Sequence, residues 1–304
     1  AVFPRAGRLG YLRHGSAVVR EARDFSPDIV HAHYASAFGA WALKLSDYPR
    51  VVSVWGSNVV EFPSNWLARR SLRKVLQAAS RITATSEYLG GVTRCFAPDL
   101  AKQITIIPFG LELPAQVEPP PEGPVRLCFI KRHKPVYGID ILLEAMHTVH
   151  RDLPEIRLTI AGEGPSTSHL KALCTRLGLD NCVSFCGLLD ENGVRDLLRA
   201  SHIMVMPSLQ ESFGVAAVEA GANARPVIAT DVGGIPEIVQ DGRSGLLVPP
   251  GDSVALADAI VKLAQAPDLR LTMGRNARHI VEDKYQWQRS LDRMISVYED
   301  VLHG

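Results

Sequence analysis

The chain of 304 residues lacks several features that would assign it directly to a functional class. It has no uninterrupted run of about 18 apolar residues, so we expect no membrane-spanning helix. Its formal net charge is only +1, without the strongly basic balance typical of nucleic-acid-binding domains. No G-x-G-x-x-G motif opens a helix, which argues against a nicotinamide-dependent dehydrogenase. No D-x-D-like motif follows a strand, which fits chemistry without a metal. We therefore expect neither a cofactor nor a metal site.

Cysteine is scarce and irregularly spaced, and no C-x-x-C pair occurs. Three of the five cysteines fall between positions 174 and 186, which raises zinc binding as an alternative. Two of these flank a strand-like run, Val183–Phe185, where free cysteines serve as small core residues. The odd number and loose spacing favour a reducing compartment, and so a cytoplasmic protein. The five are Cys95, Cys128, Cys174, Cys182 and Cys186.

Short apolar runs alternate with amphipathic stretches along the whole chain. The predicted strands are Asp28–Val30, Val51–Val54, Ile82–Ala84, Ile104–Ile107, Val125–Ile130, Ile156–Ala161, Ile203–Met206, Val227–Thr230 and Leu246–Val248. Helical periodicity is clearest over Ile141–His150, His169–Leu177 and Val254–Ala264. Near-continuous apolar strands that alternate with helices are typical of parallel sheets covered on both faces. The sequence therefore predicts an α/β protein.

A proline-rich segment over residues 113–124 (LPAQVEPPPEGP) interrupts the alternation. Proline disfavours both a helix interior and a central strand, so we interpret this segment as a linker. The predicted organisation is a first domain over residues 1–113, a linker over 114–124 and a second domain over 125–284. A last helix, within residues 285–304, is expected to pack back on the first domain.

Two carboxylates frame the loop that follows the predicted strand Ile203–Met206. Ser212 is a good N-cap residue, so we expect a helix to start near it, with Glu211 before the helix and Glu219 along it. Gly214 permits close approach of a ligand to the backbone. Amides at a helix N-terminus bind anions such as a diphosphate, and a carboxylate can accept hydrogen bonds from both hydroxyls of a ribose. On spacing alone, two solvated surface glutamates are the simpler interpretation.

The sequence around this pair resembles family 4 of the retaining glycosyltransferases. The family's E-x7-E motif corresponds to Glu211-SFGVAAV-Glu219, and the similarity continues through Pro226–Thr230, Gly233-Gly234 and Gly245–Val248. One departure is Ala224-Arg225, where the family usually has glycine before Pro-Val. The resemblance covers residues from about 27 to 304.

This resemblance implies a GT-B fold, with two Rossmann-like domains facing a cleft and the nucleotide sugar on the second domain. The implied reaction moves a hexosyl group from a nucleoside diphosphate to an acceptor hydroxyl, with retention and without a metal. Glu219 would bind the ribose, and Glu211 would lie against the donor sugar. The backbone amides expected to meet the sugar and the diphosphate are those of Phe213, Gly214 and Val215.

A cationic segment, Lys131–Asp140, follows the predicted strand Val125–Ile130. It resembles the family's G-R-L-x-x-x-K-G motif, with Arg132 in the place of the arginine and Tyr137 in the place of the usual lysine. Cations at a strand end suit a diphosphate, although a solvated loop is an equal alternative. Either Lys131 or Lys134 would supply the missing charge.

Two further segments of the second domain match family loops near the donor. The Gly162 loop (AGEGP) follows the predicted strand Ile156–Ala161, and by itself would be read as a simple turn. Leu188 ends a segment, FCGL, whose backbone often lies near the nucleobase in the family.

In the first domain, Asp28–Tyr34 (DIVHAHY) predicts a strand that runs into a loop. His33 would lie at the edge of the interdomain cleft by resemblance, while a metal role for the His-x-His pair lacks an evident third ligand. The family's H-G-x-D motif reads Trp55-Gly-Ser-Asn58 here, so a catalytic histidine is missing at that position. Two more strands and a glycine-rich loop usually precede this segment. We therefore expect an N-terminally truncated, incomplete first domain that binds donor but transfers poorly.

Two alternatives to a transferase stay open at this point. A sugar-nucleotide epimerase has the same double-Rossmann architecture, and an inactive nucleotide-sugar-binding module would fit Trp55 and Asn58. The expected partners are a nucleotide sugar and a glycan or lipid-linked acceptor, with peripheral contact at the inner face of a membrane. No nucleic acid partner is expected.

Overall fold

The computed structural model describes residues 8–56, 59 and 66–303, and the chain forms two compact units. The first unit contains the described residues of 1–109 together with 288–303, and the second unit is Gly110–Trp287. The proline-rich segment 113–124 thus belongs with the second unit, and all but the first residue of the C-terminal helix belong with the first.

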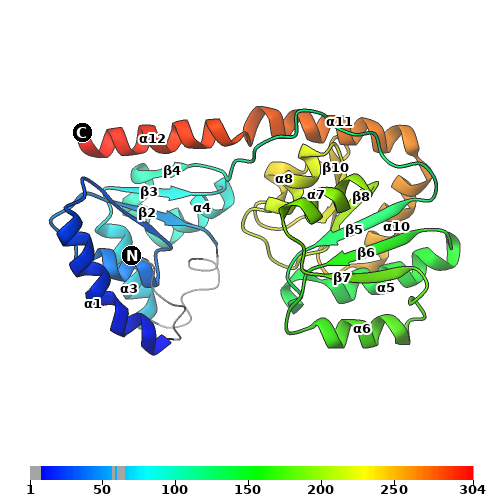
Figure 1. Ribbon diagram of the computed structural model, residues 1–304, viewed down its shortest axis with the longest axis horizontal. Helices are drawn as coiled ribbons and strands as arrows, with labels where there is room; N and C mark the ends of the chain where they lie inside the picture. Colours follow the sequence, from blue (N-terminus) through cyan, green and yellow to red (C-terminus); the bar gives the residue numbers. More distant parts are fainter. Residues whose placement is uncertain (1–7, 57–58, 60–65, 304) are drawn as a thin grey trace. The chain divides into compact units, whose positions relative to one another are not determined.

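The first unit is built on four parallel strands in the order β1-β2-β3-β4 (Figure 1). They span Val30–His33 (β1), Arg50–Val54 (β2), Arg81–Ala84 (β3) and Ile104–Ile106 (β4). The accompanying helices are α1 (Arg8–Phe25), α2 (Ala37–Ala42), α3 (Trp66–Gln77), α4 (Glu87–Phe96), the 3-10 helix η1 (Pro98–Gln103) and α12 (Trp287–His303). The first strand was predicted two residues early. It forms over Val30–His33 because these residues pair in register with Arg50–Ser53.

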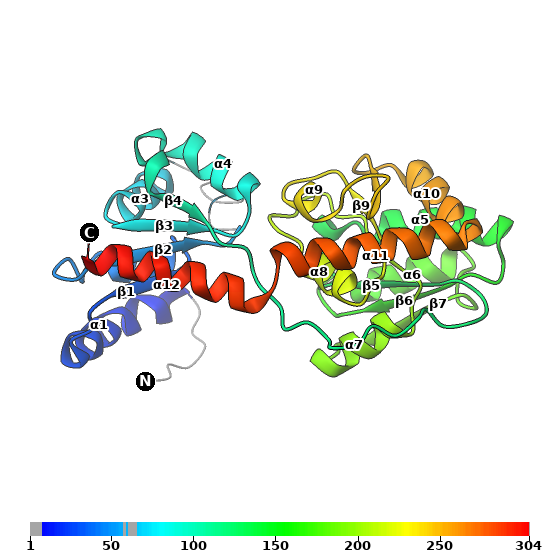
Figure 2. The ribbon, with the colours of Figure 1, turned by 90° about the horizontal axis from the view of Figure 1, so that it is seen from above.

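Strand β2 shows why this sheet is covered on both faces. Val51 packs with Val297 of α12, whereas its neighbour Val52 packs with Leu72 and Val75 of α3. Successive side chains of a strand point to opposite faces, so the two valines enter two separate cores. Helix α12, near the end of the chain, therefore completes one face of a sheet formed near its beginning (Figure 2).

The second unit has six parallel strands in the order β7-β6-β5-β8-β9-β10. Counted within the unit this is the order 3-2-1-4-5-6 of a doubly wound Rossmann fold. The strands are β5 (Arg126–Ile130), β6 (Arg157–Ala161), β7 (Val183–Gly187), β8 (Ile203–Met206), β9 (Val227–Thr230) and β10 (Gly245–Val248). The helices are η2 (Pro135–Tyr137), α5 (Ile139–Asp152), α6 (Thr167–Arg176), α7 (Glu191–Arg199), α8 (Val215–Ala222), α9 (Ile235–Ile238), α10 (Ser253–Gln265) and α11 (Pro267–Lys284).

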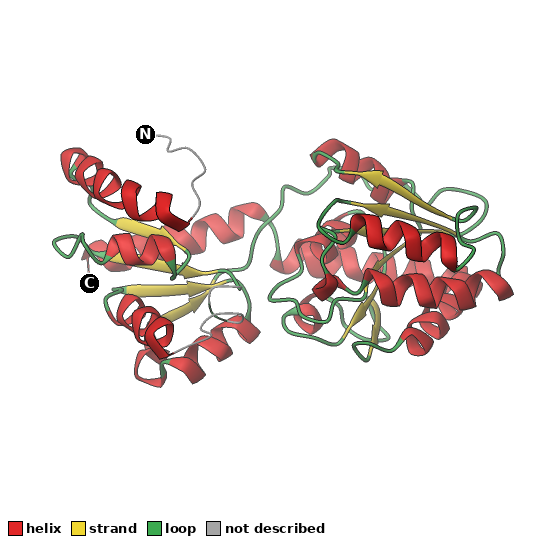
Figure 3. Cartoon of the chain, turned by 90° about the horizontal axis from the view of Figure 1, so that it is seen from below, coloured by secondary structure: helices red, strands yellow, loops and turns green. Residues whose placement is uncertain are grey.

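The core of this unit follows from its uniformly apolar central strands. Every residue of β8 and β9 is buried, as expected for strands covered on both faces. Helix α5 packs beside α10, and α8 packs beside α11. Figure 1 shows α11 above the strands and α5 with α6 below them. Figure 3 distinguishes the helices (red) from the strands (yellow) of both units.

Helix α8 ends in a Schellman motif formed by a residue that is not glycine. The amide of Ala224 donates to the Gly221 carbonyl (2.9 Å) and that of Arg225 to the Ala220 carbonyl (2.9 Å), while Ala224 has φ +52°. Ala224 belongs to the pair Ala224-Arg225, which stands where the family usually has glycine before Pro-Val. Alanine is strained in this left-handed conformation because its Cβ crowds the backbone.

We therefore expect the Ala224→Gly variant to be more stable than the wild type. Relief of the backbone strain should exceed the added entropy of the unfolded chain by about 0.5–1 kcal/mol. Urea unfolding would measure the difference. Ala217→Gly, inside the same helix, is the control and is expected to destabilise.

Candidate functional site

The loops after β5 and β8 meet at the carboxyl edge of the second sheet, where the strand order reverses. The Leu209 amide donates to the Val136 carbonyl (2.8 Å). A Cβ on Gly138 would collide with the Pro207 carbonyl oxygen. Ligands of open α/β sheets bind in the crevice at such a switch point. The fold thus brings the loop after β5 and the loop after β8, both predicted from the sequence to bind the donor, into contact.

One ion pair joins the two loops, between the Lys131 ammonium and the Glu211 carboxylate. The lysine side chain is 20% exposed and the glutamate side chain 10% exposed. The ammonium also lies 4.7 Å from the centroid of the Tyr137 ring. Lys134, by contrast, is exposed. Tyr137, which replaces the usual motif lysine, therefore makes a cation–π contact with the Lys131 ammonium.

A cavity of about 840 Å³ opens at the ends of β5, β6 and β7. Four predicted donor-binding residues line it, namely Lys131, Arg132, Gly162 and Leu188. Gly162 has φ +121°, and a Cβ there would collide with the Lys131 carbonyl oxygen. Thr167, Leu189 and Val194 also line the cavity. These three were missed in the sequence, where no motif distinguishes them.

His133 lies behind this cavity and adds no charge to it. Its side chain is fully buried, with Nδ1 2.8 Å from the Thr167 hydroxyl. Burial lowers its pKa, so the ring is neutral at pH 7. The cations at the mouth of the cavity are those predicted, Lys131 and Arg132.

Helix α8 begins at Val215, two residues later than an N-cap at Ser212 would place it. Gly214 occupies the N-cap with φ +112° and ψ 52°, so the prediction of an N-cap at Ser212 was wrong. Its left-handed backbone favours glycine, and a Cβ there would also lie 2.8 Å from Cδ1 of Ile235. The extended loop brings the backbone of residues 211–213 against Gly234, whose amide donates to the Glu211 carbonyl (3.1 Å).

A second cavity, of about 520 Å³, is lined in part by Glu219. Its walls come from α7, from α8 and from Gly110–Pro114, and Val194 borders both cavities. Burial raises the pKa of Glu219 to about 6, the charge of Glu191 adds to the shift, and Lys131 opposes it. A half-buried carboxylate at this position has lost part of its hydration, and hydroxyl donors of a ligand would replace it.

In the first unit, His33 is exposed at the carboxyl end of β1. Its ring lies 4.0 Å from that of His31 and 4.9 Å from that of Trp55. His31 is 2.7 Å from the Tyr298 hydroxyl and 2.7 Å from the Ser53 hydroxyl. The pKa of His31 is lowered to about 4, mainly by burial and further by the charge of the neighbouring His33.

The remaining predictions for this unit concern metals and Asn58. Among the residues that the structure describes, no cluster of three His, Cys, Asp or Glu side chains could hold a metal. The predicted residue Asn58 lies outside the described residues. In the same part of the chain, no helix has the length and apolarity needed to span a membrane.

Comparisons with known proteins match both units. The family described as glycosyl transferases group 1 matches residues 114–280, and the family described as glycosyl transferase 4-like matches residues 2–86. Glycogen synthase of Mycobacterium tuberculosis is 29% identical over 295 residues, which cover 93% of this chain and 71% of that protein.

Two solved structures share the fold. Sucrose-phosphate synthase from Thermosynechococcus elongatus matches with a TM-score of 0.86 and 24% identity over 99% of this chain and 80% of that one. Anabaena HepE in complex with UDP and glucose matches with a TM-score of 0.83 and 23% identity over 98% of this chain and 84% of that one.

The two parallel-sheet units are those of a GT-B enzyme, and the predicted fold class is confirmed. The chain belongs to the glycosyl transferases group 1 family. It is a glycosyltransferase that transfers a sugar from a sugar nucleotide to an acceptor. This result favours the transferase predicted from the sequence over the epimerase and over the inactive module.

Proposed function

We propose that the second unit holds a nucleoside diphosphate hexose across the switch point between β5 and β8. The observation that carries the proposal is the convergence of Lys131, Glu211 and Glu219 there. The lysine pairs with the first glutamate and acts electrostatically on the second. Two cavities that share Val194 adjoin this group, and different parts of a nucleotide sugar would occupy them.

The diphosphate would bind to Arg132, to one further lysine and to the amides of Phe213, Gly214 and Val215. Lys131 supports that role better than Lys134 because it is half-buried and already directed at Glu211. The first amides of a helix have no intrahelical acceptor and lie at its positive end. As the glycosyl bond breaks, these groups would stabilise the charge that develops on the leaving diphosphate, without a metal.

Glu219 would accept hydrogen bonds from the ribose hydroxyls, with the base near Leu188 and Gly162. Glu211 would lie against the hexose and stabilise positive charge at its ring as the bond to the diphosphate weakens. The reaction would retain the anomeric configuration, and we assign no protein nucleophile.

The acceptor side of the reaction would involve the first unit, with His33 and Asn58. A glycan or a lipid-linked polysaccharide precursor fits the family. The five cysteines are free, in keeping with a reducing cytoplasm, and peripheral contact with the inner face of a membrane is part of the proposal.

A donor panel tests this function. The protein would be incubated with UDP-, GDP- and ADP-hexoses, with UDP-glucose first because HepE was crystallised with it. Stabilisation against heat by one donor is the expected result, followed, once glycan acceptors are added, by release of the nucleoside diphosphate and formation of a glycosylated acceptor. An altered sugar that stays on the nucleotide would contradict the proposal, as would a panel without any binding.

The raised pKa of Glu219 predicts a pH dependence of donor binding. Ribose hydroxyls donate to the ionised carboxylate, so affinity should be complete above pH 7 and decline as pH falls through about 6. Without ligand the sign is opposite: burial disfavours the charge, so stability should fall as pH rises from the ordinary carboxyl pKa to about 6.

Titration calorimetry with a UDP-sugar between about pH 5 and pH 8 would measure this effect, because its diphosphate diester does not titrate in that range. Glu219→Gln should flatten the profile. A profile that is the same in both proteins would exclude Glu219 as the titrating group.

A further inference from the structure

Arg225 is a fully buried arginine whose side-chain hydrogen bonds all go to backbone carbonyls. Its side chain is 1% exposed. Nε donates to Leu198 (3.0 Å), Nη1 to Asn223 (3.0 Å) and Nη2 to Arg199 (3.1 Å). Nη1 and Nη2 both donate to the Glu118 carbonyl, each at 3.2 Å, and Nη2 also donates to the Pro119 carbonyl at 3.4 Å.

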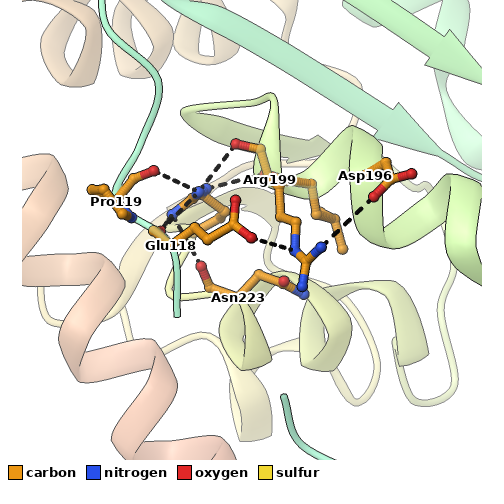
Figure 4. A network of polar contacts seen from close by, with 7 residues as sticks. Glu118, Pro119, Asp196, Arg199 and Asn223 are labelled. Atoms are coloured by element: carbon orange, nitrogen blue, oxygen red, sulfur yellow. Dashed lines mark hydrogen bonds and ion pairs between the residues drawn. The ribbon is translucent and has the colours of Figure 1, made fainter. Parts of the chain in front are cut away.

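These carbonyls help to explain how a buried cation is tolerated, and the charge of the Glu118 carboxylate, which pairs with Arg199, also favours the charged guanidinium. Leu198 and Arg199 end α7, and Asn223 is the C-cap of α8. The C-terminus of a helix carries partial negative charge, so two helix ends meet at the guanidinium. Figure 4 shows the carbonyl groups of Pro119, Arg199 and Asn223 gathered in this way. The planar fork of arginine presents five N–H donors in fixed directions, whereas lysine has only three, all on one nitrogen.

Arg225 donates to carbonyls of three segments: the end of α7, the C-cap of α8 and residues 118–119. Each of these segments is part of, or continuous in sequence with, one wall of the Glu219 cavity. Helix α7 contributes Glu191, Val194, Arg195 and Leu198, and α8 with its C-cap contributes Glu219, Ala222 and Asn223. The third wall, Gly110–Pro114, runs directly into the segment gripped at Glu118 and Pro119. Arg278 secures the same wall, because its Nη2 donates to the Pro114 carbonyl (3.1 Å).

We propose that Arg225 is a positioning residue that fixes these three walls relative to one another and so sets the affinity for the nucleoside part of the donor. The inference rests on the proposed placement of the ribose at Glu219. Arg225 would not touch the donor, because its donors are directed at backbone carbonyls. The diphosphate half of the site, at Lys131 and Arg132, depends on other loops and would be unaffected.

The test compares Arg225→Lys with the wild type by calorimetry, using UDP and inorganic diphosphate as probes. Affinity for UDP should fall about tenfold, since small displacements of a binding wall are costly, whereas affinity for diphosphate should stay unchanged. Arg270→Lys is the matched control. Arg270 is less buried than Arg225 but likewise donates to carbonyls at a helix end, those of Leu263 (2.7 Å) and Ala264 (2.8 Å), and it lines neither cavity. It should lose heat stability and keep its UDP affinity.

The outcomes separate this inference from the proposed function. A wild type that binds neither UDP, GDP nor ADP would overturn the donor site and the inference with it. A wild type that binds UDP, with equal affinity in Arg225→Lys, would overturn the inference alone, as would equal losses for UDP and diphosphate. Should Arg225→Lys fail to fold, Arg278→Met is expected to weaken UDP binding in the same selective way, and unchanged affinity in that folded variant would overturn the inference.

Discussion

The Glu211→Ala variant is expected to lose about 10² to 10³-fold in kcat, a loss typical of removing one preorganised electrostatic group. The carboxylate is 10% exposed and is held by Lys131 at the switch point, so it is oriented before the donor arrives. Its charge is most useful when positive charge develops on the sugar ring, which happens in the transition state and not in the ground state.

Donor affinity should change much less than kcat in this variant. Loss of Glu211 leaves the Lys131 ammonium without its partner, and a free cation at this position would attract the diphosphate more strongly. The Kd of the nucleotide sugar is therefore expected to stay similar or to decrease. Separate measurement of Kd by calorimetry and of kcat by product formation checks this division.

Two controls sharpen the result. Glu211→Gln preserves the size of the side chain and removes its charge, so it should resemble the alanine variant if charge is what matters. Glu144→Ala removes an exposed carboxylate from α5 of the same unit and should behave as wild type. A kcat for Glu211→Ala equal to that of the wild type would remove Glu211 from the reaction.

The fold could be predicted from the sequence because its strands are short, apolar and regularly separated by helices. The ends of the elements were harder where tertiary contacts decide them. Ser212 has the better intrinsic N-cap propensity, yet α8 begins after Gly214, whose left-handed backbone (φ +112°) favours glycine and which lies against the Ile235 side chain. Pairing with β2 likewise shifted β1 to Val30–His33.

In the site, too, some features could be predicted from the sequence pattern and others depend on tertiary packing. The E-x7-E spacing located both glutamates, but the partner of Glu211 lies 80 positions away and follows from the strand order. The departure at Ala224-Arg225 was visible in the sequence as a minor irregularity. The hydrogen bonds of Arg225 could not be foreseen, because every acceptor is a backbone carbonyl and carries no signal in the sequence.

The Glu219→Ala variant is expected to bind the donor about 10 to 100-fold more weakly, the range for losing hydrogen bonds to a charged group. The carboxylate lies in the 520 Å³ cavity, and its pKa of about 6 leaves it ionised at pH 7. It can then accept from both ribose hydroxyls. Since the ribose takes no part in bond breaking, kcat at saturating donor should fall far less than affinity.

A double-mutant cycle identifies the group that Glu219 contacts. Wild type and Glu219→Ala would each be titrated with UDP and with 2′-deoxy-UDP. If the carboxylate binds the 2′-hydroxyl, removing either partner costs most of the interaction and the two losses are far from additive. Glu191→Ala is the control within the same cavity: its exposed carboxylate pairs with Arg195 and adds negative charge near Glu219, so its removal should leave UDP binding equal or slightly tighter. Additive losses in the cycle would place the ribose elsewhere and leave Glu219 as a wall of the cavity.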